Sequence, residues 1–145
     1  LIDSLKQNVA NDGSILVWYE SYEKSRNKEM AEIYPEAADF LNAFNDRIID
    51  LMKPFSQGLV RDAEFMGSSS IKKVLPALFP DLTYEDLDIR EGEAAALKWK
   101  EVTLGDASEA QQEKVYSDLI KYCKLDTLAM VKIHQELIAY SIEHY

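Results

Sequence analysis

Ile15-Leu16-Val17-Trp18-Tyr19 is the segment most informative about fold class, because it places five large apolar residues in a row. The turn sequence Asn11-Asp12-Gly13-Ser14 precedes it, and the acidic Glu20 follows it. A short apolar run between polar residues is typical of a strand buried on both faces, as in a parallel sheet. We therefore expect a central strand over residues 15–19. No other segment has so strong a strand pattern, so the sequence predicts an α/β fold dominated by helices.

The rest of the chain has mostly helical patterns. Apolar residues at helical spacing predict helices over residues 1–10, 22–34, 35–52, 93–102, 108–123 and 125–144. Helix caps are expected at Ser21, Thr83 and Ser108. Residues 55–66 show no periodicity and predict a loop, while Pro76 should kink or end a short helix that starts after Ser70. No linker or repeat interrupts the chain, so we expect a single domain over residues 1–145.

Composition excludes several classes of protein. The 145 residues carry 16 Lys and Arg against 26 Asp and Glu, a net charge of −10, which argues against a generally basic nucleic-acid-binding module. No apolar run approaches the roughly 20 residues of a membrane span, so no membrane partner is expected. The single cysteine, Cys123, suits a reducing compartment, which predicts a cytoplasmic protein. Cys123 itself is expected to be a small core residue.

Tyr122 and Asp126 form the best candidate for chemistry. Helical geometry places residues four apart on one face, so the phenol and the carboxylate would be neighbours. A carboxylate can hold a divalent cation, and a phenol can orient the water that attacks a phosphate. In the structural alternative, Tyr122 is a half-buried helix residue and Asp126 is the cap or first-turn acid of the last helix. Spacing alone favours this alternative.

Two other segments carry candidate residues. Glu20 and Glu23 follow the predicted strand, where ligands collect in open α/β sheets, although a helix N-terminus also favours acids. Lys72 and Lys73 follow Ser70 in the first turn of a short helix, where the helix dipole disfavours cations. That placement suggests a phosphate partner. Two solvated lysines on a polar face are an alternative explanation, and this segment alone favours it.

Three segments together resemble the ribonuclease H-like DEDD family of 3′–5′ exonucleases, specifically an uncharacterised bacterial branch. The first is Ile15-Leu16-Val17-Trp18-Tyr19-Glu20-Ser21-Tyr22-Glu23-Lys24-Ser25-Arg26. The second is Gly67-Ser68-Ser69-Ser70-Ile71-Lys72-Lys73-Val74-Leu75-Pro76-Ala77-Leu78, and the third is Tyr122-Cys123-Lys124-Leu125-Asp126-Thr127-Leu128-Ala129-Met130. The Tyr-x-x-x-Asp form of the third segment marks the DEDDy subclass.

The resemblance implies a reaction and roles for these residues. Such enzymes use four carboxylates to hold two Mg²⁺ or Mn²⁺ ions, which activate a water and stabilise the leaving oxygen of a terminal nucleotide. By resemblance, Asp126 and Glu23 are metal ligands and Tyr122 orients the water. Ser70 and Lys72 would lie near the substrate path. The implied substrate is nucleic acid, either DNA or RNA.

The chain also departs from the family pattern. The first motif, an Asp-x-Glu on the first strand, is absent. Glu23 stands where the wider superfamily usually has Asp, and Glu20 where this branch usually has Asn. These departures imply the C-terminal part of a larger nuclease-like domain, a partial ribonuclease H-like fold with its first three strands upstream of Leu1. We expect such a fragment to be inactive alone.

This interpretation has one structural consequence, and two other functions stay open beside it. A strand at residues 15–19 that lacks its neighbours has an exposed edge, which predicts self-association as a homodimer or a more helical packing. The alternative function is a non-catalytic helical interaction or scaffold domain, in which the same pattern serves folding. A small-molecule metal hydrolase is a weaker third reading.

Overall fold

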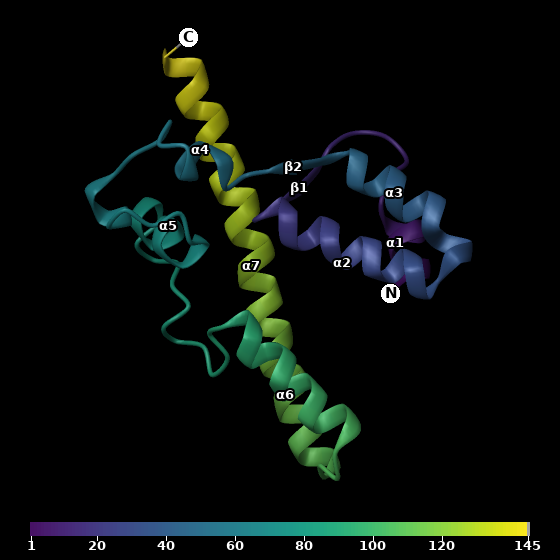
Figure 1. Cartoon of the computed structure of the whole chain (residues 1–145). Helices are drawn as coiled ribbons and strands as arrows, with labels where there is room; N and C mark the ends of the chain where they lie inside the picture. The colour runs from purple at the N-terminus through teal and green to yellow at the C-terminus, as the bar shows by residue number, and fades with distance from the viewer. Residues whose placement is uncertain (145) are drawn as a thin grey trace. The chain divides into compact units, whose positions relative to one another are not determined.

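The structure is a computed structural model that describes residues 1–144, with side chains described up to Ile142. Helices dominate it, and a two-stranded parallel sheet accompanies them, so the predicted helix-rich α/β class is confirmed (Figure 1). The chain separates into two compact units, Leu1–Arg61 and Asp62–Tyr145. The expectation of one domain over residues 1–145 stays a prediction.

The first unit holds the sheet and the helices that pack around it. Its elements are α1 (Ile2–Asn8), β1 (Ile15–Val17), α2 (Glu20–Ile33), the 3₁₀ turn η1 (Pro35–Ala37), α3 (Ala38–Asp46), β2 (Ile48–Asp50) and α4 (Lys53–Ser56). Strand β1 pairs in parallel with β2, with Ile15 opposite Ile48 and Val17 opposite Asp50. Helices α2 and α3, which connect the two strands, lie side by side (Figure 1).

The predicted helix over residues 35–52 is wrong in its second half. Helix α3 ends at Asp46, and Ile48–Asp50 form strand β2, with Ile48 and Asp50 buried and Ile49 exposed. This alternation is the two-residue period of a strand, whereas the apolar spacing around it also fits a helix. Pairing with β1 decides between the two. The Arg47 side chain assists, because it donates hydrogen bonds to the carbonyl oxygens of Gly13 and Asp12 in the turn before β1.

The start of α2 is capped by Asp50 and not, as predicted, by Ser21. Strand β1 ends at Val17, earlier than predicted, and Tyr19 adopts a left-handed conformation with φ 73° just before α2 begins at Glu20. The buried Asp50 carboxylate accepts the backbone N–H groups of Tyr19 and Glu20, both at 3.0 Å. It also accepts the N–H of Met52 at 2.9 Å. A helix start is therefore stabilised by a side chain from the neighbouring strand.

The second unit consists of helices and one long irregular segment. Its elements are the 3₁₀ turn η2 (Ala63–Phe65), α5 (Ile71–Leu78), α6 (Gly92–Leu104) and α7 (Glu109–His144). The predicted helix over residues 93–102 is confirmed within the longer α6. The short helix after Ser70 is also present, but it continues through Pro76 to Leu78 instead of ending at the proline. The cap at Ser108 is confirmed too, because Ser108 and Gln111 exchange side-chain-to-backbone hydrogen bonds.

Two other local predictions for the chain are wrong. The loop over residues 55–66 contains the end of α4 and the turn η2. Thr83 caps no helix, because residues 79–91 contain no helix; its hydroxyl oxygen accepts the N–H of Glu85 at 3.1 Å. In both places, a short turn satisfies the backbone where we expected a loop or a longer helix.

Helix α7 runs without interruption over 36 residues, so the predicted boundary between residues 123 and 125 is wrong. No glycine or proline lies near that point, and the Thr127 hydroxyl donates to the Cys123 carbonyl inside the helix at 2.9 Å. One face of α7 packs into a core formed by Leu75, Tyr84 and Ala129. Cys123 is exposed rather than in the core, which corrects its predicted place.

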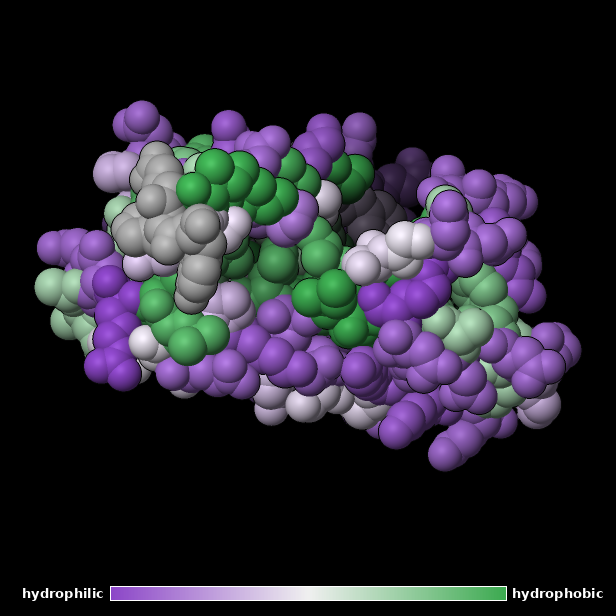
Figure 2. Space-filling model, turned by 90° about the horizontal axis from the view of Figure 1, so that it is seen from above, coloured by the Kyte–Doolittle hydropathy of each residue, from purple (hydrophilic) through white to green (hydrophobic). Residues whose placement is uncertain are grey.

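Within residues 1–144, no helix combines the length and the apolar character that crossing a membrane requires. The sheet of the first unit has two strands, so β1 has a strand partner on one side only within the described residues. Self-association through its other edge stays a prediction. Hydrophilic side chains cover much of the face drawn in Figure 2, in keeping with a chain of which 29% of residues are charged.

Candidate active site

Helix α7 brings Tyr122 and Asp126 to one face, as predicted from their spacing. Both side chains are half-buried, and the helix continues through both positions. The structural alternative for Asp126 is therefore wrong, because Asp126 lies in the middle of a helix and not at its start. The structural alternative for Tyr122, a half-buried helix residue, agrees with the structure.

Tyr84 joins this pair and was missed by the sequence analysis. Its hydroxyl donates a hydrogen bond to Asp126 Oδ1 at 2.5 Å, and the residue is only 4% exposed. Its ring lies 6.0 Å from the ring of Tyr122, at an angle of 54° between the planes. Tyr84 belongs to the irregular segment 79–91, far from α7 in sequence. No local pattern indicates this contact, because the residue looks like part of a helix cap.

Lys72 also reaches this group, from the first turn of α5. Its ammonium lies 5.9 Å from the centre of the Tyr84 ring and forms an ion pair with Glu91. The structure thus brings together three of the predicted site residues, Tyr122, Asp126 and Lys72. Ser70 is exposed at the start of α5, where its carbonyl accepts the N–H groups of Lys73 and Val74, and its side chain makes no capping bond.

The two tyrosines are held in their neutral form. Burial, followed by the hydrogen bond to Asp126, raises the pKa of the Tyr84 hydroxyl well above its usual value. Burial, followed by the negative charge of Asp126, raises the pKa of Tyr122 in the same direction. Both phenols therefore carry a proton near neutral pH and can donate hydrogen bonds.

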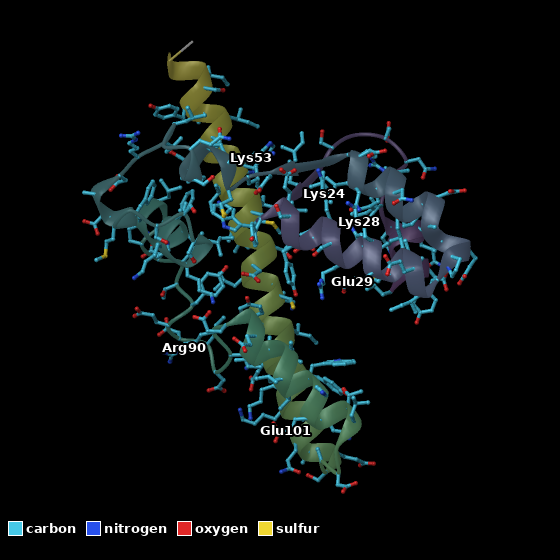
Figure 3. The ribbon with its side chains drawn as sticks, in the orientation of Figure 1. Lys24, Lys28, Glu29, Lys53, Arg90 and Glu101 are labelled. Carbon is cyan, nitrogen blue, oxygen red and sulfur yellow. The ribbon has the colours of Figure 1, made fainter. Side chains whose placement is uncertain are left out.

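Glu20 and Glu23 belong to the first unit, in the first turn of α2. Glu20 forms ion pairs with Lys53 and with Lys24, the latter at 3.0 Å, and these lysines lower its pKa. Both lysines are labelled in Figure 3. Glu23 differs, because its side chain is half-buried and has no ion pair or hydrogen bond within the described residues. Burial raises its pKa. Of the two acids, Glu23 is thus the one free to take a ligand.

A polar cleft of about 600 Å³ in the second unit adjoins the group formed by Tyr84, Tyr122 and Asp126. It lies between α5 and the irregular segment that leads to α6, in which Arg90 is labelled in Figure 3. Its lining residues are Glu64, Met66, Lys72, Lys73, Pro76, Ala77, Pro80, Thr83, Tyr84, Glu85, Arg90 and Glu91. Tyr84 and Lys72 therefore belong both to this cleft and to the group around Asp126.

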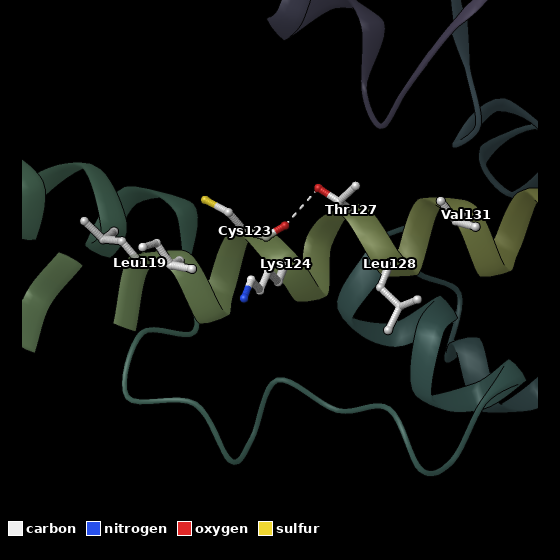
Figure 4. A pocket seen from close by; sticks show the side chains of 7 residues that line it. Leu119, Cys123, Lys124, Thr127, Leu128 and Val131 are labelled. Carbon is white, nitrogen blue, oxygen red and sulfur yellow. Dashed lines mark hydrogen bonds between the residues drawn. The ribbon is translucent and has the colours of Figure 1, made fainter. Parts of the chain in front are cut away.

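A second, apolar groove of about 590 Å³ lies along α7 (Figure 4). Its lining residues all come from this helix: Leu119, Ile120, Cys123, Lys124, Thr127, Leu128 and Val131. Several of them are substantially exposed, including Ile120 at 55% and Val131 at 48%. Unlike the first cleft, this groove offers a mainly hydrophobic surface.

The side chains present fit part of a divalent-metal site. Asp126 supplies carboxylate oxygens, the ligands that Mg²⁺ and Mn²⁺ prefer, and Tyr84 orients that carboxylate as outer partners of metal ligands do. Within residues 1–144, however, no three His, Cys, Asp or Glu side chains gather closely enough to hold a metal ion. Four clustered carboxylates of a two-metal site are therefore not found in the described part of the chain.

Comparison with known proteins gives relatives whose names assign no function. Residues 1–70 match a family described as a domain of unknown function, DUF2779. An uncharacterized protein of Mycoplasma genitalium, MG366, is 31% identical over 144 residues, and its homolog in Mycoplasma pneumoniae is 32% identical over 146. An uncharacterized protein of Ureaplasma parvum is 27% identical over 149 residues.

These alignments cover 92% of this chain but 21–22% of each relative. The chain thus spans about a fifth of the length of the curated relatives it matches. No solved structure matches the chain.

Proposed function

We propose that this chain is part of a metal-dependent 3′–5′ exonuclease-like domain with a ribonuclease H-like fold, which hydrolyses phosphodiesters of nucleic acid. The observation that carries the proposal is the group on α7, where Asp126 and Tyr122 share a face and Tyr84 fixes the carboxylate. A carboxylate beside a neutral phenol is the pairing that the resemblance to DEDDy exonucleases requires. The parallel strand pair followed by acids is compatible with the proposed fold.

Each residue then has a definite task. Asp126 would hold Mg²⁺ or Mn²⁺, and Glu23 is retained as a further predicted metal ligand. Divalent ions in such sites activate a water and stabilise the leaving oxygen. Tyr122, protonated near neutral pH, donates a hydrogen bond that orients the attacking water. Lys72 and Ser70 are proposed to contact substrate.

The test is hydrolysis by the full gene product with Mn²⁺, using single-stranded DNA and RNA labelled at the 5′ end. We expect the strands to shorten progressively from the 3′ end. Asp126→Asn should lower the rate by at least about 100-fold, and Tyr122→Phe by about 10- to 100-fold, as for groups that act in the reaction. Tyr116→Phe is the matched control, because Tyr116 is an exposed tyrosine of α7 whose hydroxyl forms a hydrogen bond with Thr103 and not with Asp126. A rate unchanged by Asp126→Asn would refute the proposal.

A second candidate, a non-catalytic interaction domain, is favoured by the apolar groove on α7. Exposed aliphatic side chains along a helix are the usual means by which helical domains bind partners. The two candidate functions differ in whether they require the Asp126 carboxylate, which does not line the groove. Only the exonuclease requires that carboxylate for its activity.

A further inference from the structure

An exposed stripe of mainly aliphatic side chains runs along α7, on the side opposite the buried Ala129 and Ile133. The members of this stripe are Ile120, Thr127, Val131, Ile138 and Ile142. The four aliphatic side chains among them are 46–75% exposed. The hydroxyl of Thr127 is already used inside the helix, because it donates to a carbonyl one turn earlier. The first three members line the apolar groove of Figure 4.

The spacing of the stripe indicates what shape of partner would cover it. Its members lie 7, 4, 7 and 4 residues apart, which is a repeat of 11 residues. Eleven residues make nearly three whole turns of an α-helix, so the stripe stays on one side of α7 over about 33 Å. A long, narrow and nearly straight apolar surface of this kind is the surface that another amphipathic helix buries.

The charges beside the stripe have one sign. Over residues 119–134, the exposed charged side chains are Lys121, Lys124 and Lys132. Asp126, the acid in this range, is half-buried on another face, where it accepts the hydroxyl of Tyr84. Lys124 and Lys132 form no ion pair within the described residues. A chain with a net charge of −10 therefore has a locally positive border along its apolar stripe.

The three lysines follow one side of the stripe. They lie three and eight residues apart, and helical geometry keeps residues at these spacings on one side of a helix. In Figure 4, Lys124 points to the same side of α7 as Leu128, away from Cys123 and Thr127. A partner helix in the stripe would thus meet positive charge along one of its borders.

This border selects among the possible occupants. A second copy of the chain would bring the same lysines and no exposed acid over residues 119–134, so charge does not favour it. An anionic membrane would attract the lysines but repel a chain of net charge −10. A helix that carries acids beside its own apolar side chains complements both the stripe and the lysines.

We propose that the stripe on α7 binds an amphipathic α-helix of a partner protein, whose apolar face is bordered by Asp or Glu side chains that meet Lys124 and Lys132. The inference does not rest on the proposed hydrolysis, because the stripe and the group around Asp126 lie on different faces of α7. It gives the second candidate function a partner of defined chemistry.

The experiment measures binding of two labelled synthetic helices to the full gene product by fluorescence anisotropy. Both peptides have about 22 residues, the length of the stripe, and carry isoleucine at the same 7 and 4 spacing. One has glutamate along the border of its apolar face, and the other has lysine there. We expect the acidic peptide to bind at least about tenfold more tightly than the basic one.

Two pairs of variants locate the binding surface. Val131→Glu places a carboxylate in the stripe and should weaken the acidic peptide at least about tenfold. Leu97→Glu is its matched control, because this leucine of α6 is 61% exposed and does not line the groove. Lys124→Glu should weaken the acidic peptide and strengthen the basic one, whereas Lys100→Glu, at an exposed lysine of α6, should change neither.

Several results would overturn the inference. Equal binding of the two peptides would show that the lysine border selects nothing. A wild-type dimer that Val131→Glu dissociates would make a second copy the occupant, and vesicles containing phosphatidylserine that lose binding in Val131→Glu would make it a membrane. Peptide binding by the 145-residue chain but not by the full gene product would mean that the same polypeptide covers the stripe.

The outcome is independent of the proposed hydrolysis. Asp126→Asn should bind the acidic peptide as the wild type does, whether or not strands are hydrolysed. A loss of peptide binding in Asp126→Asn as large as in Val131→Glu would contradict a surface on a separate face of α7.

Discussion

At the scale of single residues, Tyr84 is the side chain on which the candidate site depends most. It is buried, it donates to Asp126, and its ring packs against Tyr122 and under Lys72. Without the Tyr84 hydroxyl, the half-buried carboxylate of Asp126 would lie on the helix face with no fixed rotamer. A hydrogen bond from a buried phenol fixes that rotamer, and this is how outer groups prepare a metal ligand.

Replacement of Tyr84 by phenylalanine tests this hydrogen bond. Tyr84→Phe keeps the ring and its packing but removes the hydroxyl that Asp126 accepts. We expect the free energy of unfolding to fall by about 1–2 kcal/mol, as for a hydrogen bond to a charged acceptor. Urea denaturation measures the change, and Tyr116→Phe, whose hydroxyl is exposed, should change it by less than about 0.5 kcal/mol. Equal effects of the two variants would show that the Tyr84 hydroxyl is not important.

Glu23 offers a test through pH. Burial raises its pKa above the ordinary value of 4.5, so its protonated form favours folding. That contribution is present below the unfolded pKa and is lost as the pH rises through the higher folded pKa. Glu23→Gln cannot ionise, so we expect it to be more stable than the wild type at pH 7, by less than about 1 kcal/mol because the side chain is half-exposed.

The stability gain from Glu23→Gln should shrink as the pH falls to about 4. Thermal unfolding across this range checks it. A difference that stays constant with pH would mean that ionisation of Glu23 does not oppose folding.

At the scale of elements, the continuity of α7 is what holds Tyr122 and Asp126 on one face. The sequence predicted two helices here, with Asp126 as the cap or first-turn acid of the second. Local patterns locate helices well but locate their ends poorly when no glycine or proline marks them. Strand β2 was not predicted for a similar reason. Its residues fit a helical spacing, and the partner that makes them a strand is β1, far away in sequence.

Lys124→Pro distinguishes one helix from two. At a helix start, proline is tolerated, but inside a helix it removes a hydrogen bond and clashes with the preceding turn. Lys124 is exposed, so packing hardly contributes. We expect Lys124→Pro to lower the unfolding free energy by about 3 kcal/mol and to reduce the helical circular dichroism signal, while Lys124→Ala is nearly neutral. Similar stability of both variants would point to two separate helices.

At the scale of the whole molecule, the residues that can do chemistry are easier to predict from the sequence than the contacts that arrange them. Tyr122, Asp126 and Lys72 were predicted from spacing and helix position, and the structure brings these three together. Tyr84 and Asp50 were missed because each acts on a segment far away in sequence, one on α7 and one on α2. Such contacts come from tertiary packing, which a local pattern does not encode.

A metal site at Asp126 is best tested by adding Mn²⁺ to the isotopically labelled chain and following the amide signals by nuclear magnetic resonance, since a paramagnetic ion broadens signals near its site. We expect broadening centred on Tyr122, Asp126 and Tyr84 at low Mn²⁺. Asp126→Asn should abolish it, while Asp106→Asn, which changes an exposed acid of the same unit, should not. Broadening spread evenly over the exposed acids, or unchanged in Asp126→Asn, would contradict a metal site at Asp126.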